Sequence, residues 1–378
     1  MSSLYLHIPF CRQRCPYCDF FSQVADLSQQ QAYVAQLQKH LQLIRRDLLR
    51  PVPLQTVYFG GGTPSLLRIS EIDALLTASD RLFGLAADCE ITLEANPGTI
   101  TASYLAQLRQ TGVNRLSLGI QTFAARQLQM LGRCHSREQG LQSIAAARAA
   151  GFDNLSLDLI FALPDQTLDT LEADVDLLLR QQPEHISVYG LTFEEGTAFE
   201  QRRQRGDLVP CSEDEYARQY EYLQQRLCRV GYEHYELSNF ALPQRRCRHN
   251  QVYWQRRTCL AAGCGAHAFS DEGFGERWAI PPDPQRFAAA LAAGKNPAQC
   301  LERFTRSGAM QETLYLALRT ADGLDRQAFA ERFGQPVEEV FAGALQQLGT
   351  AALMTPTRIA LRPQSWLIYD HLVSAFLG

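Results

Sequence analysis

Three cysteines, Cys11, Cys15 and Cys18, lie within eight positions of one another in the segment CRQRCPYCDF, and Phe20 occupies the place where a fourth would complete a cage. Zinc could take three thiolates and a distant histidine, although structural zinc usually draws its cysteines from C-x-x-C pairs. A disulfide would leave one thiol over. A [4Fe–4S] cluster needs one ligand per iron, so three thiolates leave one iron open to a small molecule. The spacing favours this cluster, with zinc and a disulfide as alternatives.

The stretch GGGTP at residues 60–64 is a second candidate for site chemistry. Glycine has no Cβ, so a ligand can approach the backbone closely there. By itself the stretch is more typical of a tight turn between a strand and a helix. Its position one strand–helix unit after the cysteines points instead to a shared site.

The elements that must position these residues show two alternating periodicities in the first two hundred residues. Helical stretches, for which Ser70 and Thr167 are predicted N-caps, separate six short apolar runs typical of buried parallel strands. Six strand–helix units predict an α/β fold built on an open or partial (β/α)6 barrel, two units short of a full barrel. The six runs lie at 3–8, 54–62, 90–97, 114–121, 154–164 and 185–193.

The pattern changes near residue 196, and we expect three parts. Residues 1–195 form the partial barrel, and residues 196–285 form a connecting helix followed by a segment rich in Tyr, Arg and Gly. Residues 286–378 form a mainly helical domain that ends in a small hairpin, which indicates a winged-helix-like lobe.

Composition excludes several classes of function. The net charge of −4 gives no electrostatic support for binding nucleic acid. No run approaches the roughly 18 apolar residues of a transmembrane segment, and the sequence shows no export signal. Eleven cysteines are an odd number, so metal binding in a reducing cytosol is a better expectation than a disulfide framework. We therefore expect a soluble, cytoplasmic protein.

The pattern C-x-x-x-C-x-x-C with Tyr17 before the last cysteine resembles the signature of the radical S-adenosylmethionine (SAM) superfamily. The resemblance implies a [4Fe–4S] cluster on Cys11, Cys15 and Cys18, whose open iron binds the amino and carboxylate groups of SAM. It also implies that an electron from the cluster cleaves SAM to a 5′-deoxyadenosyl radical. That is cofactor chemistry, which the protein holds and shields.

Further motifs narrow the resemblance. The segments YLHIPFC, EANPGT, GVNRLSLGIQTF and LDLIFALPDQ are similar to the oxygen-independent coproporphyrinogen III oxidase family, and CPYCDF, HNQVYW and GCGAH most resemble its heme-chaperone branch, HemW. Two of the positions that the resemblance assigns to SAM, Glu94 and Asp158, have an alternative role, in which each is a strand-end charge stabilised by a helix N-terminus. The resemblance implies SAM binding by Tyr5, Tyr17, Gly61, Gly62, Thr63, Glu94, Gln121, Arg133 and Asp158.

Two features separate the branches. The oxidases carry an N-terminal extension before the first tyrosine and a further cysteine two places after the third ligand. Here Tyr5 lies near the start and Phe20 replaces that cysteine. We therefore expect a heme chaperone that delivers heme to acceptor proteins. The alternative is an oxygen-independent coproporphyrinogen III dehydrogenase of porphyrin biosynthesis. Whether the chain cleaves SAM, and so acts as an enzyme, stays open.

The segment CRHNQVYW at residues 247–254 contains H-N-x-x-Y-W, which the resemblance associates with heme. His249 is the predicted heme ligand, Cys247 and His267 are secondary candidates, and the alternative is a buried turn with aromatic packing. The segment from Arg256 to Cys259 is unusual for the family. Its arginines could pair with heme propionates, but a solvated basic turn is the commoner outcome.

The resemblance also suggests partners. It implies heme-accepting respiratory proteins associated with the membrane, peripheral attachment at the inner membrane face, and a homodimer.

Overall fold

The computed structural model describes residues 2–48 and 53–377. At its centre six parallel strands follow one another in chain order within a twelve-stranded sheet. These strands are β1 (Ser2–Ile8), β2 (Leu54–Gly61), β3 (Leu85–Ala95), β4 (Arg115–Gln121), β5 (Leu155–Phe161) and β6 (His185–Gly190). The predicted α/β fold with a partial (β/α)6 barrel is confirmed.

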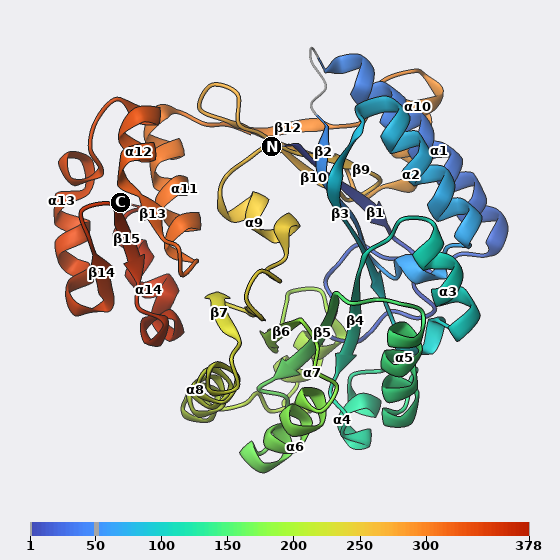
Figure 1. Ribbon diagram of the computed structural model, residues 1–378, viewed down its shortest axis with the longest axis horizontal. Helices are drawn as coiled ribbons and strands as arrows, with labels where there is room; N and C mark the ends of the chain where they lie inside the picture. The colour runs from blue at the N-terminus through green and yellow to red at the C-terminus, as the bar shows by residue number, and fades with distance from the viewer. Residues whose placement is uncertain (1, 49–52, 378) are drawn as a thin grey trace.

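Helices connect these strands and cover one face of the sheet (Figure 1). Their first turns follow ordinary capping rules: Thr167, for example, accepts a hydrogen bond from the backbone N–H of Thr170. The prediction for Ser70 is wrong, because that helix begins at Ile69 with Arg68 as its N-cap, two residues earlier than predicted. The helices are α1 (Leu27–Asp47), α2 (Ile69–Phe83), α3 (Ala102–Gln110), α4 (Ala125–Met130), α5 (Arg137–Ala149) and α6 (Leu168–Leu179).

The two faces of the parallel strands differ in chemistry. On β1, Leu4, Leu6 and Ile8 are fully buried in the main hydrophobic cluster. Because side chains alternate along a strand, Tyr5 and His7 lie on the opposite, concave face. The sheet thus buries aliphatic side chains beneath the helices and keeps its polar and aromatic side chains inside the barrel.

Additional strands extend the sheet at both ends. Strand β9 pairs in parallel with β1, and three antiparallel strands continue beyond it, while β8 and β7 lie beyond β6. The added strands are β7 (Glu233–Glu236), β8 (Asn239–Ala241), β9 (Cys259–Ala262), β10 (His267–Ser270), β11 (Glu276–Ala279) and β12 (Gln299–Arg303). The helices of this part are α7 (Ala198–Gln204), α8 (Glu213–Arg229), α9 (Arg248–Trp254) and α10 (Pro284–Ala292).

The C-terminal lobe has a hydrophobic cluster of its own, which runs from Ala309 to Phe376. It is mainly helical with one three-stranded sheet in the order β13-β15-β14, and it lies apart from the barrel helices (Figure 1). This confirms the predicted C-terminal helical domain. Its elements are α11 (Arg306–Leu318), β13 (Leu324–Asp325), α12 (Arg326–Phe333), α13 (Val337–Leu348), β14 (Ala352–Met354), β15 (Arg358–Leu361) and α14 (Tyr369–Ser374).

The domain boundaries after residues 195 and 285 stay predictions. Strands β7 to β12 lie on both sides of the second boundary, and all of them join the large sheet. A search of the described helices finds none long and apolar enough to cross a membrane.

Candidate functional site

The three clustered cysteines lie on the loop that leaves β1 at the carboxyl end of the parallel strands. Two backbone hydrogen bonds close this loop, from Cys11 N to Gln23 O (3.0 Å) and from Gln23 N to Pro9 O (2.7 Å). A third, from Phe199 N to Pro16 O (2.9 Å), ties the loop to α7. The thiols of Cys11, Cys15 and Cys18 are free and half-buried. The loop is therefore anchored at its base and along its length.

Side chains from neighbouring strand ends reach two of the thiols. Thr63 Oγ1 lies 3.5 Å from Cys11 Sγ, and Arg133 Nη1 lies 3.9 Å from Cys15 Sγ. Burial, followed by the neighbouring thiols, raises the pKa of Cys18 to about 11. A metal binds the thiolate, so a bound cation must drive the loss of that proton.

The donor set fits a cluster. No three His, Cys, Asp or Glu side chains among residues 2–48 and 53–377 converge on one metal ion. A four-iron cluster requires no such convergence, because each thiolate binds its own iron. The hydroxyl of Thr63 and the guanidinium of Arg133 can donate to thiolate sulfurs, which would stabilise their charge.

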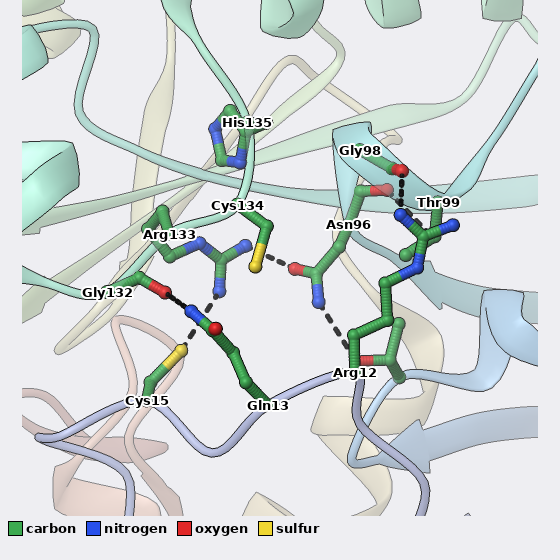
Figure 2. A pocket seen from close by; sticks show the side chains of 11 residues that line it. Arg12, Gln13, Cys15, Asn96, Gly98, Thr99, Gly132, Arg133, Cys134 and His135 are labelled. Carbon is green, nitrogen blue, oxygen red and sulfur yellow. Dashed lines mark hydrogen bonds between the residues drawn. The ribbon is translucent and has the colours of Figure 1, made fainter. Parts of the chain in front are cut away.

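Arg133 links the cysteine loop to β3 and β4 (Figure 2). Its guanidinium donates to Gly119 O (2.7 Å) and to Asn96 Oδ1, and it reaches toward Cys15. Asn96 in turn donates to Thr63 Oγ1 (2.9 Å). On the same side, Arg12 donates to Gly98 O (2.7 Å). One network thus connects the loop with three strand ends.

The glycine stretch at the end of β2 lies directly against the cysteine loop. Gly62 N donates to Ile8 O (2.8 Å), and Thr63 N donates to Phe10 O (2.7 Å). A Cβ on Gly62 would lie 2.7 Å from Phe10 O, and one on Gly61, whose φ is +110°, would lie 2.6 Å from the His7 ring. Glycine is required here because the backbone of β2 packs on the loop after β1.

Two partly buried carboxyls lie inside the barrel below this edge. Tyr58 donates its hydroxyl to Glu94 Oε1 (2.8 Å), and the hydroxyls of Ser117 and Ser156 donate to Asp158 at 3.2 and 3.3 Å. Burial raises the pKa of both carboxyls, that of Glu94 to about 7, and the charge of Asp158 contributes to the shift of Glu94. Both carboxyls find side-chain hydroxyls as partners.

Gln121 ends β4 in a left-handed conformation with φ of 67°. Its Oε1 is buried and has no hydrogen-bond partner among the described residues. An unpaired buried acceptor calls for a donor from a ligand or water. Hydroxyl and amino groups of a nucleoside supply such donors, so this atom fits the predicted SAM pocket.

The two predicted tyrosines occupy different surroundings. Tyr5 packs in the barrel beside Tyr58, with ring centroids 6.1 Å apart, and burial raises its pKa. Tyr17 packs against Phe199 of α7 at 6.1 Å. The structure thus places Tyr5 with Glu94 inside the barrel, and Tyr17 between α7 and the guanidinium of Arg133.

The structure places His249 away from the cysteine loop, between α9 and the concave face. Its ring stacks on Tyr58 at 4.9 Å, Nδ1 is 2.6 Å from Thr56 Oγ1, and Nε2 is 2.9 Å from Tyr253 Oη. The side chain is buried, and burial lowers its pKa to about 3. Both ring nitrogens are already paired, so heme ligation by His249 stays a prediction that requires α9 to open.

The secondary heme candidates are dispersed. Cys247 is buried with Sγ 3.7 Å from Glu90 Oε1, and Cys259 lies on β9 near Tyr253. His267 lies on β10, which is separated from β1 in the sheet by β9. Arg256 is not part of a solvated turn, because it is buried and paired with Glu312 of α11.

Sequence reasoning missed three residues of this region: Tyr58, Asn96 and Arg115. Asn96 lies in the quoted motif EANPGT, so its position was available as a signal. Arg115 is buried inside the barrel, and its charge lowers the pKa of Glu94 and of Asp158 against the larger effect of burial. The only signal for Arg115 in the sequence was a charged residue at the start of an apolar strand.

Comparisons with known proteins cover the whole chain. The model of the radical SAM superfamily matches residues 5–178, and that of the HemN C-terminal domain matches residues 304–363. The chain is 34% identical to the heme chaperone HemW of Lactococcus lactis subsp. lactis, over 100% of this chain and 97% of the relative. It is 33% identical to the heme chaperone HemW of Bacillus subtilis, over 100% of both chains.

Among solved structures, the fold is similar to that of coproporphyrinogen III oxidase (HemN) from Escherichia coli, described as a radical SAM enzyme. The TM-score is 0.85 at 22% identity, and the match covers 99% of this chain and 89% of the other. At this identity the likeness establishes the fold alone.

Proposed function

The chain belongs to the HemW family of radical SAM proteins, and from this premise we propose that it binds a [4Fe–4S] cluster, SAM and heme and delivers the heme to acceptor proteins. Membership of the radical SAM superfamily implies the cluster and SAM. The observation that carries the proposal is the position of the cysteine loop, where side chains of Thr63 and Arg133 reach two of the thiols at the carboxyl edge of the barrel.

In this proposal each part of the edge has a task. The thiols of Cys11, Cys15 and Cys18 hold the cluster. When bound, the cluster and SAM supply one-electron reductive chemistry at the SAM sulfur. Arg133 pairs with the carboxylate of SAM, and backbone groups of the glycine stretch at Gly61 and Gly62, which carries no Cβ, bind its amino group.

The interior of the barrel holds the nucleoside part of SAM. The unpaired Oε1 of Gln121 accepts from the adenosine, while Glu94 and Asp158 accept from the ribose hydroxyls. Tyr5 limits the depth of the pocket, because it packs beneath the glycine stretch, where a Cβ on Gly60 would lie 2.8 Å from its ring.

Heme carriage is supported by the family membership and by α9, which carries H-N-x-x-Y-W. We extend the proposal to respiratory heme proteins at the membrane as acceptors and to a homodimer as the working assembly.

The test uses the full chain, purified without oxygen, loaded with hemin and mixed with a heme-free respiratory hemoprotein. We expect iron and sulfide in cluster proportion, a change in the EPR spectrum of the reduced cluster on adding SAM, and movement of the Soret band to the acceptor. Turnover of coproporphyrinogen III to protoporphyrinogen IX with SAM and a reductant would instead establish the dehydrogenase. Zinc without iron would rule out the cluster.

A further inference from the structure

A cleft of about 490 Å³ separates α9 from the C-terminal lobe. In Figure 1 α9 lies between the large sheet and the helices α11 and α12. The lining comes from α9 and the residues after it, from α11 and from α12. A volume of this size lies in the range of ordinary ligand sites. The cleft is separate from the cysteine loop and from the strand ends around it.

The two faces of α9 have different surroundings. His249 and Tyr253, four positions apart, point to the sheet and bond to each other and to Thr56. Gln251, Trp254 and Gln255 line the cleft. Side chains three and four positions apart share a helix face, so the H-N-x-x-Y-W motif is split. Its histidine and tyrosine fix α9 on the barrel, and its tryptophan faces the lobe.

The cleft is basic although the chain as a whole carries a net charge of −4. Five arginines and two aspartates line it. Arg246 and Arg358 pair with Asp322. The exposed arginines Arg257 and Arg332 differ, because no carboxylate of the described residues forms an ion pair with either one. Arg332 Nη2 donates to Asp271 O (3.1 Å) and Gly273 O (3.3 Å), so the Arg257 guanidinium and the other N–H groups of Arg332 remain available to an anion.

Two buried donors at the cleft also lack acceptors. Trp254 Nε1 and Arg256 Nη1 have no hydrogen-bond partner among the described residues. The Arg319 guanidinium stacks on the ring of Trp254 at 4.4 Å, which holds the indole in place. Unpaired buried donors cost free energy unless a ligand or water accepts from them. The missing groups are acceptors, and carboxylate oxygens are acceptors that could satisfy both donors.

We infer that this cleft binds the carboxylate-bearing edge of a flat aromatic ligand, with Arg257 and Arg332 pairing with its carboxylates and Trp254 beside its ring. Resting on the proposed function, the ligand is heme, and the carboxylates are its two propionates. Trp254 supplies an aromatic ring from α9, whereas Phe329 and Phe333 of α12 form the apolar floor of the other side as part of the core of the lobe. The cleft lining contains neither histidine nor cysteine, so recognition here acts on the porphyrin edge and does not depend on iron.

The experiment compares three probes on the full chain: hemin, metal-free protoporphyrin IX and protoporphyrin IX dimethyl ester, whose carboxylates are blocked. We expect protoporphyrin IX to compete with hemin, and the ester to bind at least tenfold more weakly, as followed by porphyrin fluorescence. The double variant Arg257→Glu with Arg332→Glu should weaken hemin and protoporphyrin IX about tenfold or more. Trp254→Phe, which keeps a ring but removes the N–H, should weaken them severalfold.

The matched control is Arg229→Glu with Arg286→Glu. These two arginines are also exposed, lie outside the cleft lining, and change the net charge equally. The inference is overturned if the cleft and control variants bind hemin alike, if the ester binds as tightly as the free acid, or if ATP displaces protoporphyrin IX. In each of these cases heme binding and delivery still stand. If hemin does not bind the parent chain at all, the proposed function fails, and the inference fails with it.

Discussion

The carboxyl edge of the barrel and the interface under α9 are two polar regions of one sheet, and they differ in how their polar groups are paired. At the edge the three thiols are half-buried, and Gln121 Oε1 has no partner within residues 2–48 and 53–377. Under α9 the ring of His249 is buried and both its nitrogens are bonded. A region with unpaired groups is prepared for a ligand, whereas a paired region holds the fold together. Both regions carry conspicuous motifs, so a motif alone does not distinguish a ligand-binding region from one that stabilises the fold.

The largest effect should come from the edge. Replacing Cys11, Cys15 and Cys18 together by alanine should remove all cluster iron and sulfide, because no other group of thiols lies on that loop. Hemin binding should be unchanged, since the cleft beside α9 is a different site. Iron and sulfide analysis with a hemin titration measures both. Retention of the full iron and sulfide content would show that the cluster lies elsewhere.

The next effect concerns the backbone contact beneath the edge. Gly62→Ala should destabilise the fold by about 3 kcal/mol or more, because the new Cβ meets backbone atoms of Phe10 and Ile8 that cannot yield cheaply. Gly343→Ala in α13 is the matched control: a Cβ there meets nothing within 4 Å, and alanine favours a helix, so a gain of up to about 1 kcal/mol is expected. Urea denaturation compares the two. Equal stabilities would mean that the strand end can move away from the loop.

A smaller effect is expected under α9. His249→Ala should cost about 2 kcal/mol at pH 7, because Thr56 and Tyr253 lose a shared partner in a buried place. The lowered folded-state pKa of about 3 means that the histidine contributes stability that is lost as the pH falls below 6.5, since only the unfolded chain then takes up the proton. The difference in melting temperature between the parent and His249→Ala should therefore narrow from pH 7 to pH 4.5.

The same variant separates a structural histidine from a heme ligand. If His249→Ala shifts the Soret band of bound hemin and leaves the melting temperature unchanged, the imidazole binds iron and α9 opens to admit it. Cys247→Ala is the companion variant, because its buried thiol lies beside the same helix but contacts Glu90.

The sequence predicted all six central strands, because parallel strands buried on one face by helices are short continuous apolar runs. Most predicted bounds lie within three residues of the observed ones, but β3 begins five residues earlier than predicted. It did not predict β7 to β12, which are three to five residues long. Five of them lie in the segment rich in Tyr, Arg and Gly, and β12 lies in the part predicted to be mainly helical. Strands this short carry too few residues to establish a period. Thr167 was correctly identified as an N-cap. Arg68 was missed because arginine is not a residue type that commonly caps helices.

For the site, local spacing was sufficient for the cysteine loop but not for its partners. The approach of Arg133 to Cys15 joins residues 118 positions apart, and the pairing of Arg256 with Glu312 joins residues 56 apart. Such contacts depend on how strands and lobes meet. The face of α9 that carries His249 could not be predicted to pack on the sheet either, because a seven-residue helix with aromatic residues on both faces fits either orientation.

The smallest expected effect is a pH dependence at the edge. The pKa of Glu94 is raised from an ordinary value of 4.5 to about 7, first by burial and then by the nearby Asp158. A carboxyl with a raised folded-state pKa contributes stability that is fully present below pH 4.5 and is lost as the pH rises through about 7, because the folded chain holds the proton and the unfolded chain releases it. Glu94→Gln keeps the shape and cannot ionise. Relative to the parent it should gain stability between pH 5 and pH 8, most steeply between pH 5 and pH 7.

Thermal melts of the SAM-free chain at pH 5, 6, 7 and 8 measure this difference. Glu221→Gln, on the exposed face of α8, is the control and should show no such trend. SAM should bind Glu94→Gln more weakly than the parent, since an amide accepts more weakly than a carboxylate and presents an N–H₂ group to the ribose hydroxyls. A pH-independent gap between parent and Glu94→Gln would mean that the carboxyl is already ionised and compensated in the folded chain. The interior of the barrel would then resemble the fully paired interface under α9.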